Sequence, residues 1–347
     1  MATFEKYNDS IMSHKKTAFS ILDLAIISKG KSLKQTFDDS LALAQIADSE
    51  GYTRYWLAEH HNSVAIGSSA TSILIGKIAE GTERIRVGAG GIMLPNHSPL
   101  IIAEQFGTLG TLYPNRIDLG LGRAPGTDQA TASAIRSDFY QAAMAFPEEV
   151  QKIQNYFSIN NATQPVRAHV AEGVEVPLYI LGSSTDSAHL AAKKGLPYAF
   201  ASHFASAQLL QALAIYHREF QPSVALDKPF TIAGISVIVT DTDAEAEFLS
   251  TSYYERIIGI LTGDRSQMTA PFEMTNQLLE VIQQPAVQQM TKYAFIGSKE
   301  TVKKGIRAFI ETTQVDELIV ATHVFSAQDR VKSYKLFAEI MCELNEE

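Results

Sequence analysis

Residues 85–121 read IRVGAGGIMLPNHSPLIIAEQFGTLGTLYPNRIDLGL, and this stretch decides the fold class. Two β-rich runs, at 85–94 and 117–121, flank an amphipathic run at 99–112 that opens on Pro99. Proline is favoured at the first position of a helix, so the stretch predicts a strand, a helix and a second strand. The strand candidates show little polar alternation, which is typical of parallel strands that are buried on both faces.

The same alternation continues along the chain. Further β-rich runs lie at 17–24, 54–59, 177–182, 197–202, 230–239 and 317–322. Further helical runs lie at 32–49, 68–79, 187–194, 205–220, 244–260, 300–312 and 328–344. Eight strands that are each followed by a helix predict an α/β protein with a (β/α)8 TIM barrel. A doubly wound open sheet is the alternative fold.

Two segments, at about 128–174 and 261–292, do not fit the alternation. Long loops inside a compact fold are usually lids or interaction segments, so we interpret both as insertions on the barrel. The sequence shows no linker and no internal repeat. We therefore predict one barrel domain over residues 1–347, with an N-terminal tail at 1–16.

Composition narrows the classes of partner. Lys and Arg number 29 and Asp and Glu number 38, which gives a net charge of −9. An acidic chain without a basic block is a poor candidate for binding nucleic acid or an anionic membrane. The single cysteine, Cys342, excludes an intramolecular disulfide and a multi-cysteine metal site, and we assign it no catalytic role. With no membrane span and no signal peptide in the pattern, we predict a cytoplasmic protein.

Glycine-rich segments end two of the strand candidates. Neither is a G-x-G-x-x-G fingerprint, because Met93 and Pro125 occupy the last glycine position. There is no P-loop, so a nucleoside triphosphatase is unsupported. Glycines that merely turn the chain are one explanation, and close approach of the backbone to a ligand is the other. Arg123 lies between glycines where a strand ends, at the edge of a barrel that carries active sites, and is suited to a bidentate contact with phosphate.

A turn of small residues follows the strand candidate at 177–182. Gly182, Ser183, Ser184 and Ser187 lie at a strand-to-helix junction, where backbone N–H groups and hydroxyls can hold an anion. An ordinary helix N-cap at this turn is the alternative.

Glu59, His60 and His61 end another strand candidate. Adjacent residues of a strand point to opposite faces, so the two histidines are not expected to chelate a metal, and we predict no metal site. One histidine at a barrel mouth can handle a proton near pH 7, and a structural histidine is the alternative. There is no G-x-S-x-G elbow, which disfavours a serine hydrolase of that type.

Five ordered segments carry a family resemblance: TAFSILDLA (17–25), YWLAEHH (55–61), VGAGGIMLPNHSPLIIAEQFGTL (87–109), RIDLGLGRAPGTD (116–128) and LGSSTDSAHLAAKKGLPYAFASHF (181–204). Together they resemble the luciferase-like flavin-dependent oxidoreductases of the bacterial luciferase superfamily, and in particular its single-chain monooxygenase branch. The resemblance covers residues 17–324. It implies a (β/α)8 barrel with reduced FMN at the C-terminal mouth.

The resemblance also implies roles for individual residues. Arg123 matches the arginine that binds the flavin phosphate, and His60 matches the active-site histidine. The phosphate-binding turn corresponds to Gly182, Ser183 and Ser184, and Ser187 to the hydroxyl that follows it. Gly90 and Gly91 align with a cis peptide beneath the flavin ring. Gly122 replaces a reactive cysteine and a small residue replaces an acidic one in the turn, so light emission is not expected.

The implied activity is oxygenation of a small, apolar, aldehyde-like substrate by reduced FMN and O2, with flavin supplied by a separate flavin reductase. An F420-dependent hydride-transfer dehydrogenase and a non-enzymatic flavin-binding protein are the alternatives. The resemblance further implies a homodimer through the helices at 68–79 and 103–112. Apolar residues expected to line the cavity, or to belong to the core, are Leu22, Met93, Phe200 and Phe204.

Overall fold

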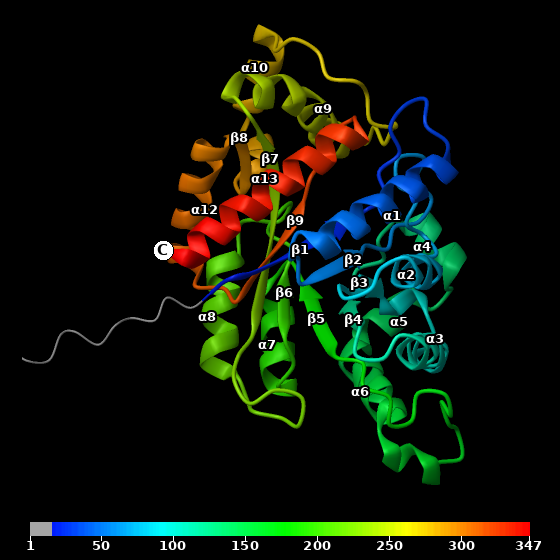
Figure 1. Ribbon diagram of the computed structural model, residues 1–347. Coiled ribbons are helices and arrows are strands. Elements are labelled where there is room, and N and C mark those ends of the chain that lie inside the picture. Colours follow the sequence, from blue (N-terminus) through cyan, green and yellow to red (C-terminus); the bar gives the residue numbers. More distant parts are fainter. Residues whose placement is uncertain (1–15) are drawn as a thin grey trace, which may run out of the picture.

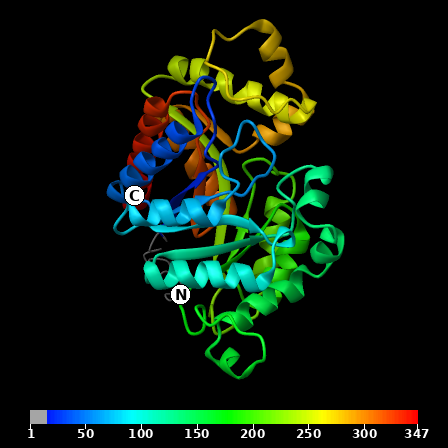
Figure 2. The same cartoon turned by 90° about the vertical axis from the view of Figure 1, so that its right-hand side faces the viewer.

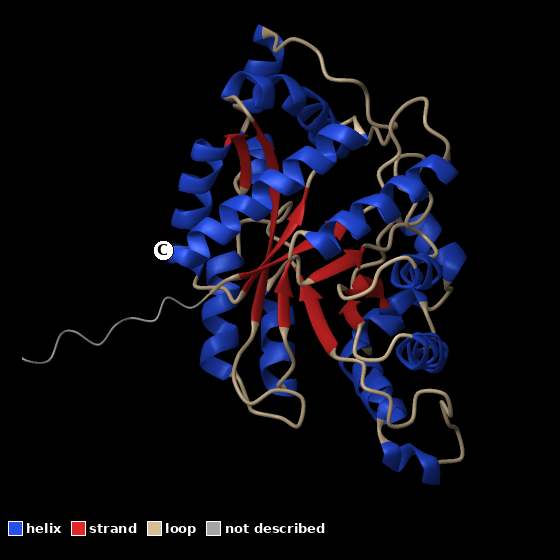
Figure 3. Ribbon diagram, in the orientation of Figure 1, coloured by secondary structure: helices blue, strands red, loops and turns tan. Residues whose placement is uncertain are grey.

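Parallel strands close into a barrel at the centre of the molecule, and helices surround it (Figure 1, Figure 3). The computed structural model describes residues 16–347, so residues 1–15 of the predicted tail lie outside the described part of the chain. The strands are β1 (Ala18–Asp23), β2 (Arg54–Leu57), β3 (Arg86–Met93), β4 (Ile117–Gly122), β5 (Leu178–Gly182), β6 (Tyr198–Phe200), β7 (Thr231–Thr240), β8 (Ala294–Ser298) and β9 (Glu317–Ala321).

The barrel contains eight of these strands. Strands β1 to β6 pair in chain order, β6 pairs with β7, and β9 lies between β7 and β1. Every pairing is parallel. The predicted (β/α)8 TIM barrel is therefore confirmed, and the open-sheet alternative is wrong.

Strand β8 lies outside the ring and was not predicted. The ten-residue β7 pairs with β9 over residues 232–236 and with β8 over residues 236–240. Most residues of β8 are only partly buried, so the segment lacks the continuous apolar character that marks the barrel strands.

The helices are α1 (Leu33–Ser49), α2 (Thr71–Glu80), α3 (Pro99–Leu112), α4 (Gln129–Ile135), α5 (Phe139–Met144), α6 (Phe146–Phe157), α7 (Thr185–Lys194), α8 (Leu209–Glu219), α9 (Asp243–Thr262), α10 (Asn276–Ile282), α11 (Pro285–Thr291), α12 (Lys299–Thr313) and α13 (Ala327–Glu346), with short 3-10 helices η1 (Leu94–Asn96) and η2 (Ile159–Thr163). Segment 128–174 contains α4, α5, α6 and η2, and segment 261–292 contains α10 and α11. No helix within residues 16–347 combines the length and the apolarity needed to cross a bilayer.

Alternating residues of the barrel strands face two separate cores. Phe19 and Ile21 of β1 pack outward against the helices, whereas Leu22 of the same strand packs inward with Trp56 and Tyr179. This alternation follows from the two-residue period of a strand. The barrel interior is consequently a filled core, and the only tryptophan of the chain, Trp56, is 1% exposed within it.

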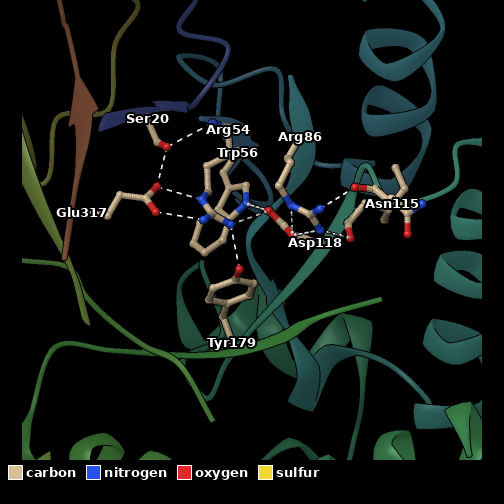
Figure 4. A network of polar contacts seen from close by, with 9 residues as sticks. Ser20, Arg54, Trp56, Arg86, Asn115, Asp118, Tyr179 and Glu317 are labelled. Atoms are coloured by element: carbon tan, nitrogen blue, oxygen red, sulfur yellow. Dashed lines mark hydrogen bonds and ion pairs between the residues drawn. The ribbon is translucent and has the colours of Figure 1, made fainter. Parts of the chain in front are cut away.

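A fully paired network of charges crosses this interior (Figure 4). The Arg54 guanidinium donates to both oxygens of Glu317, at 2.7 and 2.9 Å, and to Asp118 Oδ2 at 2.8 Å. Arg86 Nε donates to the other oxygen of Asp118 at 2.9 Å, and Trp56 Nε1 donates to Asp118 Oδ2 at 3.1 Å. Burial alone would lower the pKa of Arg54, but the charges of Glu317 and Asp118 outweigh it and raise that pKa well above its ordinary value. Through the hydrogen bond to Asp118, the network holds the Trp56 ring in place inside the barrel.

Candidate active site

A cavity of about 1730 Å³ opens where the barrel strands end. Its walls come from β3 itself, from the segments that follow β1, β2, β4, β5, β6, β7 and β9, and from both predicted insertions. Pockets for one drug-sized ligand measure roughly 300–1,000 Å³, so this cavity has room for two ligands side by side. Its position at the C-terminal edge is where barrel enzymes carry out their chemistry.

Gly90 lines the floor of the cavity, and Gly91 is buried next to it. The peptide bond between them is cis, as the resemblance implies, and the pairing of β3 with β4 shifts register at this point. A Cβ atom on Gly90 would lie 2.8 Å from Leu22 Cδ1 and 3.0 Å from Trp56 Cβ. A Cβ atom on Gly91 would lie 2.8 Å from the carbonyl oxygen of Gly120. The missing side chains let this part of β3 pack closely against Trp56 and Gly120.

The residues that the sequence predicts to bind a phosphate lie together at one side of the mouth. Arg123 follows β4, and its half-exposed side chain donates from Nη2 to Asp186 Oδ2 at 3.1 Å. Asp186 lies in the first turn of α7, and Ser184 is the N-cap residue of that helix. The Ser184 side chain makes no capping hydrogen bond, but Gln208 Oε1 accepts from the Thr185 backbone N–H at 3.2 Å and so caps one of the first N–H groups of the helix. The other N–H groups at this helix N-terminus, beside an arginine, are suited to an anion.

Gly182 and Ser187 complete this turn. A Cβ atom on Gly182 would collide with the Ser187 hydroxyl, so only glycine fits there. That hydroxyl lies 2.7 Å from the carbonyl oxygen of Ser184 and 3.0 Å from the Tyr198 hydroxyl. All three predicted turn residues (Gly182, Ser183 and Ser184) and Ser187 line the cavity together with Arg123.

His60 lies in the cavity wall after β2. Its Nδ1 is 3.2 Å from the carbonyl oxygen of Gly126, and its backbone N–H donates to Ser68. A carbonyl only accepts, so Nδ1 carries the proton and Nε2 keeps its lone pair. Burial lowers the pKa of His60 below its ordinary value, so the ring is neutral at pH 7. His60 is therefore arranged to accept a proton at Nε2.

Glu59 organises the segment beside His60, and the sequence did not reveal it. Its carboxylate accepts from His61 Nε2 at 2.8 Å, His97 Nε2 at 2.9 Å, Asn96 Nδ2 at 3.1 Å and the Met93 backbone N–H at 3.0 Å. Burial alone would raise the pKa of Glu59, but the hydrogen bonds from His61 and His97 outweigh it and lower the pKa to about 2.

The argument that placed His60 and His61 on opposite faces of a strand was wrong, because β2 ends at Leu57. Glu59, His61 and His97 form a group whose ligand atoms lie within 4.8 Å of one another. The hydrogen bonds from His61 and His97 to Glu59 account for this arrangement without a metal. They hold the two imidazole rings in place around the carboxylate.

The opposite side of the mouth carries polar groups that the sequence also did not reveal. His203 follows β6, His323 follows β9 and Arg256 lies on α9, and all three line the cavity. No partner exists within residues 16–347 for Nδ1 of His203, both ring nitrogens of His323 and Nε of Arg256.

Three of the four predicted apolar residues, Leu22, Met93 and Phe204, line the cavity. For Phe200 the core alternative holds, because it is 1% exposed and packs in the outer core with Tyr198. Cys342 is exposed on α13 and is not among the lining residues.

The family model described as luciferase-like monooxygenase matches residues 17–317. A relative from Escherichia coli (strain K12), named luciferase-like monooxygenase, is 44% identical over 96% of this chain and 99% of its own length. The N-acetyl-S-alkylcysteine monooxygenase of Bacillus subtilis (strain 168) is 30% identical over 92% of this chain and 97% of its own length.

Solved structures agree with these sequence comparisons. Apo-MsnO8 superposes with a TM-score of 0.85 and 30% identity, covering 93% of this chain and 98% of that one. An FMN complex of the oxygenating constituent of 3,6-diketocamphane monooxygenase from Pseudomonas putida superposes with a TM-score of 0.70 and 18% identity, covering 93% of this chain and 97% of that one. An F420-dependent secondary alcohol dehydrogenase superposes with a TM-score of 0.69 and 16% identity, covering 94% and 99%. At these lower identities the likeness shows the fold alone.

Proposed function

The chain belongs to the luciferase-like monooxygenase family, and from this premise we propose that it uses reduced FMN and O2 to oxygenate a small organic substrate. Membership makes the chain an oxidoreductase, so we set aside the alternative of a non-enzymatic flavin carrier. The observation that carries the proposal is that Gly90, Arg123 and the N-terminus of α7 line one large cavity.

The residues at the mouth fit a flavin mononucleotide. Arg123 and the N-terminus of α7 at Ser183 and Ser184 would hold the phosphate, since backbone N–H groups and a guanidinium both favour an anion. The peptide between Gly90 and Gly91 would lie beneath the flat ring, because Gly90 lines the cavity. When bound, reduced FMN supplies the electrons that activate O2, and the protein supplies position, proton handling and a dry cavity.

His60 would handle the proton of the reaction. Its Nε2 accepts, because Nδ1 is committed to the carbonyl of Gly126. Glu59, held by His61 and His97, positions the backbone of the same segment and of Met93. We expect His60→Asn to lower kcat about 100-fold with little change in FMN affinity.

The pH dependence follows from the lowered pKa of His60. Above pH 6.5 the neutral ring predominates, so kcat is flat on this side. The rate is expected to fall only at a pH below 6.5, as the ring becomes protonated through its lowered pKa. A rate that rises on acidification would contradict a role for His60 as a base.

The cofactor is tested by titrating the purified protein separately with FMN and with F420. Quenching of Trp56 fluorescence reports binding, because this single tryptophan lies directly beneath Gly90. Tighter binding of FMN supports the proposal. Much tighter binding of F420 would replace it with a hydride-transfer dehydrogenase.

A separate flavin reductase is the proposed source of reduced FMN. Steady-state assays with NAD(P)H are run with and without an added reductase, and turnover is expected only when the reductase is present. Equal turnover with NAD(P)H alone would refute this part of the proposal. Two classes of compound are the first substrates to assay. One is the aliphatic aldehydes, and the other is the N-acetyl-S-alkylcysteines that appear in the name of the B. subtilis relative.

Two further parts of the proposal concern the state of the protein in the cell. Helices α2 and α3 lie side by side on one face (Figure 2), where Ile73, Ile101 and Leu112 are exposed by 72%, 46% and 62%. These apolar side chains support a homodimer through α2 and α3, and light scattering that gives the mass of one chain would refute it. We also propose a cytoplasmic location, which the single cysteine favours.

A further inference from the structure

The wall of the cavity opposite Arg123 contains a partly buried arginine without an acidic partner. Arg256 lies on α9, and no hydrogen bond or ion pair joins it to any residue within 16–347. Burial alone lowers the pKa of Arg256 to about 10, with no contribution from a carboxylate. The group stays charged at pH 7, and a buried charge that lacks a counterion destabilises a fold. A charge retained at such a cost in a ligand cavity indicates that its counterion arrives with a ligand.

The acidic residues near this wall are already committed. Asp23 accepts from Arg330 Nη2 at 2.6 Å, and Glu59 accepts from His61, His97 and Asn96. Glu255 lies on the exposed side of α9 and accepts from the Thr269 hydroxyl. None of these carboxylates neutralises Arg256.

Two partly buried histidines line the same cavity as Arg256, and they have buried ring nitrogens without a hydrogen-bond partner. His203 Nδ1 and both nitrogens of His323 lack a partner within the described residues. Gly234 of β7 makes the space for His203, since a Cβ atom there would collide with Nδ1. Burial lowers the pKa of His203 to about 4, so the ring is neutral at pH 7 and offers one N–H donor. The wall therefore presents one positive charge and neutral donors.

We infer that Arg256, His203 and His323 bind the carboxylate of an organic acid, whose apolar body contacts Ile257, Leu278 and Val281 on the same side of the cavity. One unpaired guanidinium suits a single carboxylate, to which it can donate two parallel hydrogen bonds. The assignment of this acid as the substrate rests on the proposed function. Its binding at the wall does not, and can be measured separately.

The first test compares the stability of the ligand-free protein with that of Arg256→Met. The substitution removes a desolvated charge and keeps the apolar stem, so the melting temperature is expected to stay level or rise. A structural role for Arg256 predicts a lower melting temperature, and that result would overturn the inference. Arg265→Met is the matched control, because Arg265 also lines the cavity but has a 53% exposed side chain that pairs with Asp128.

The second test measures binding of hexanoate, hexanamide and hexylammonium by calorimetry in the presence of FMN. Hexanoate is expected to bind the natural protein and Arg265→Met equally, and to bind Arg256→Met about 30-fold more weakly or worse. Arg256→Lys, which keeps the charge, is expected to recover part of the affinity. Equal binding of hexanoate and hexanamide, or no loss in Arg256→Met, would overturn the inference.

A reduced flavin ring is the other anionic group that this wall could meet. FMN affinity is therefore measured for both redox states in the natural protein and in Arg256→Met. Loss of affinity for reduced FMN that exceeds the loss for hexanoate would overturn the inference in favour of the cofactor. Hexanoate binding through Arg256 without any FMN binding would leave the carboxylate site intact and refute the proposed function.

Discussion

Two arginines of the molecule, the buried Arg54 and the partly buried Arg256, differ in whether they have acidic partners. Arg54 lies inside the barrel, 6% exposed in its side chain, and is paired with two carboxylates that are fully buried. Arg256 lies at the mouth and is paired with none among the described residues. The pKa of Arg54 is raised by its partners, whereas the pKa of Arg256 is lowered by burial to about 10. We interpret Arg54, whose charge is neutralised by protein carboxylates, as a structural residue. We interpret Arg256, whose charge is not, as a residue that binds a ligand.

The largest expected effect tests the balanced member of this pair. Arg54→Met leaves Glu317 and Asp118 buried with reduced compensation, so the free energy of unfolding should fall by about 3–5 kcal/mol. Urea denaturation measures it. Arg84→Met is the control, because that side chain is 75% exposed and should change stability by less than about 0.5 kcal/mol. A loss below about 1 kcal/mol in Arg54→Met would show that the network is not a structural element.

At acidic pH, the unpartnered histidines at the mouth should lower the free energy of unfolding. The pKa of His203 is about 4 in the folded protein and near 6.5 when unfolded, so the unfolded chain binds more protons in this window. Stability is then lost as the pH falls from 6.5 toward 4. Between pH 6.5 and pH 5, the natural protein should lose about 2 kcal/mol more stability than His203→Asn. Denaturant titrations at both pH values measure this, and His169→Asn, with an 86% exposed side chain, is the control. An equal acid loss in His203→Asn would contradict the account.

Arg123 adds a third case to the comparison of Arg54 and Arg256, because it is an exposed arginine that pairs with an exposed carboxylate. Arg123→Met should weaken FMN binding about 10-fold and leave riboflavin binding unchanged, because only FMN carries a phosphate. Fluorescence of Trp56 measures both affinities. Equal weakening of FMN and riboflavin would place Arg123 at the ring instead.

The smallest expected effect concerns Asp186. This carboxylate holds Arg123 at 3.1 Å in the structure and would repel a phosphate at the same place. Asp186→Asn should therefore tighten FMN binding roughly two- to fivefold, within the range of an exposed charge pair. Weaker FMN binding in this variant would mean that Asp186 positions Arg123 rather than competes for it.

The parts of the molecule that could be predicted from sequence are those set by local pattern. The barrel strands show as apolar runs because both of their faces are buried, whereas the half-exposed β8 does not. Arg123 and Gly182 were recognisable because Arg123 directly follows β4 and Gly182 ends β5. Glu59 could not be recognised, because its partner His97 lies 38 residues away and reaches it only through the fold after β3. The role of Arg256 could not be predicted either, because its lack of a partner depends on how the folded chain packs around it.

A crystal structure of the protein soaked with FMN and hexanoate tests the central claim most directly. The account predicts the FMN phosphate at Arg123 and the N-terminus of α7, the ring over Gly90 and Gly91, and the hexanoate carboxylate at Arg256. A phosphate bound at Arg256, or hexanoate bound at Arg123 with the opposite wall in contact with the flavin ring, would contradict it.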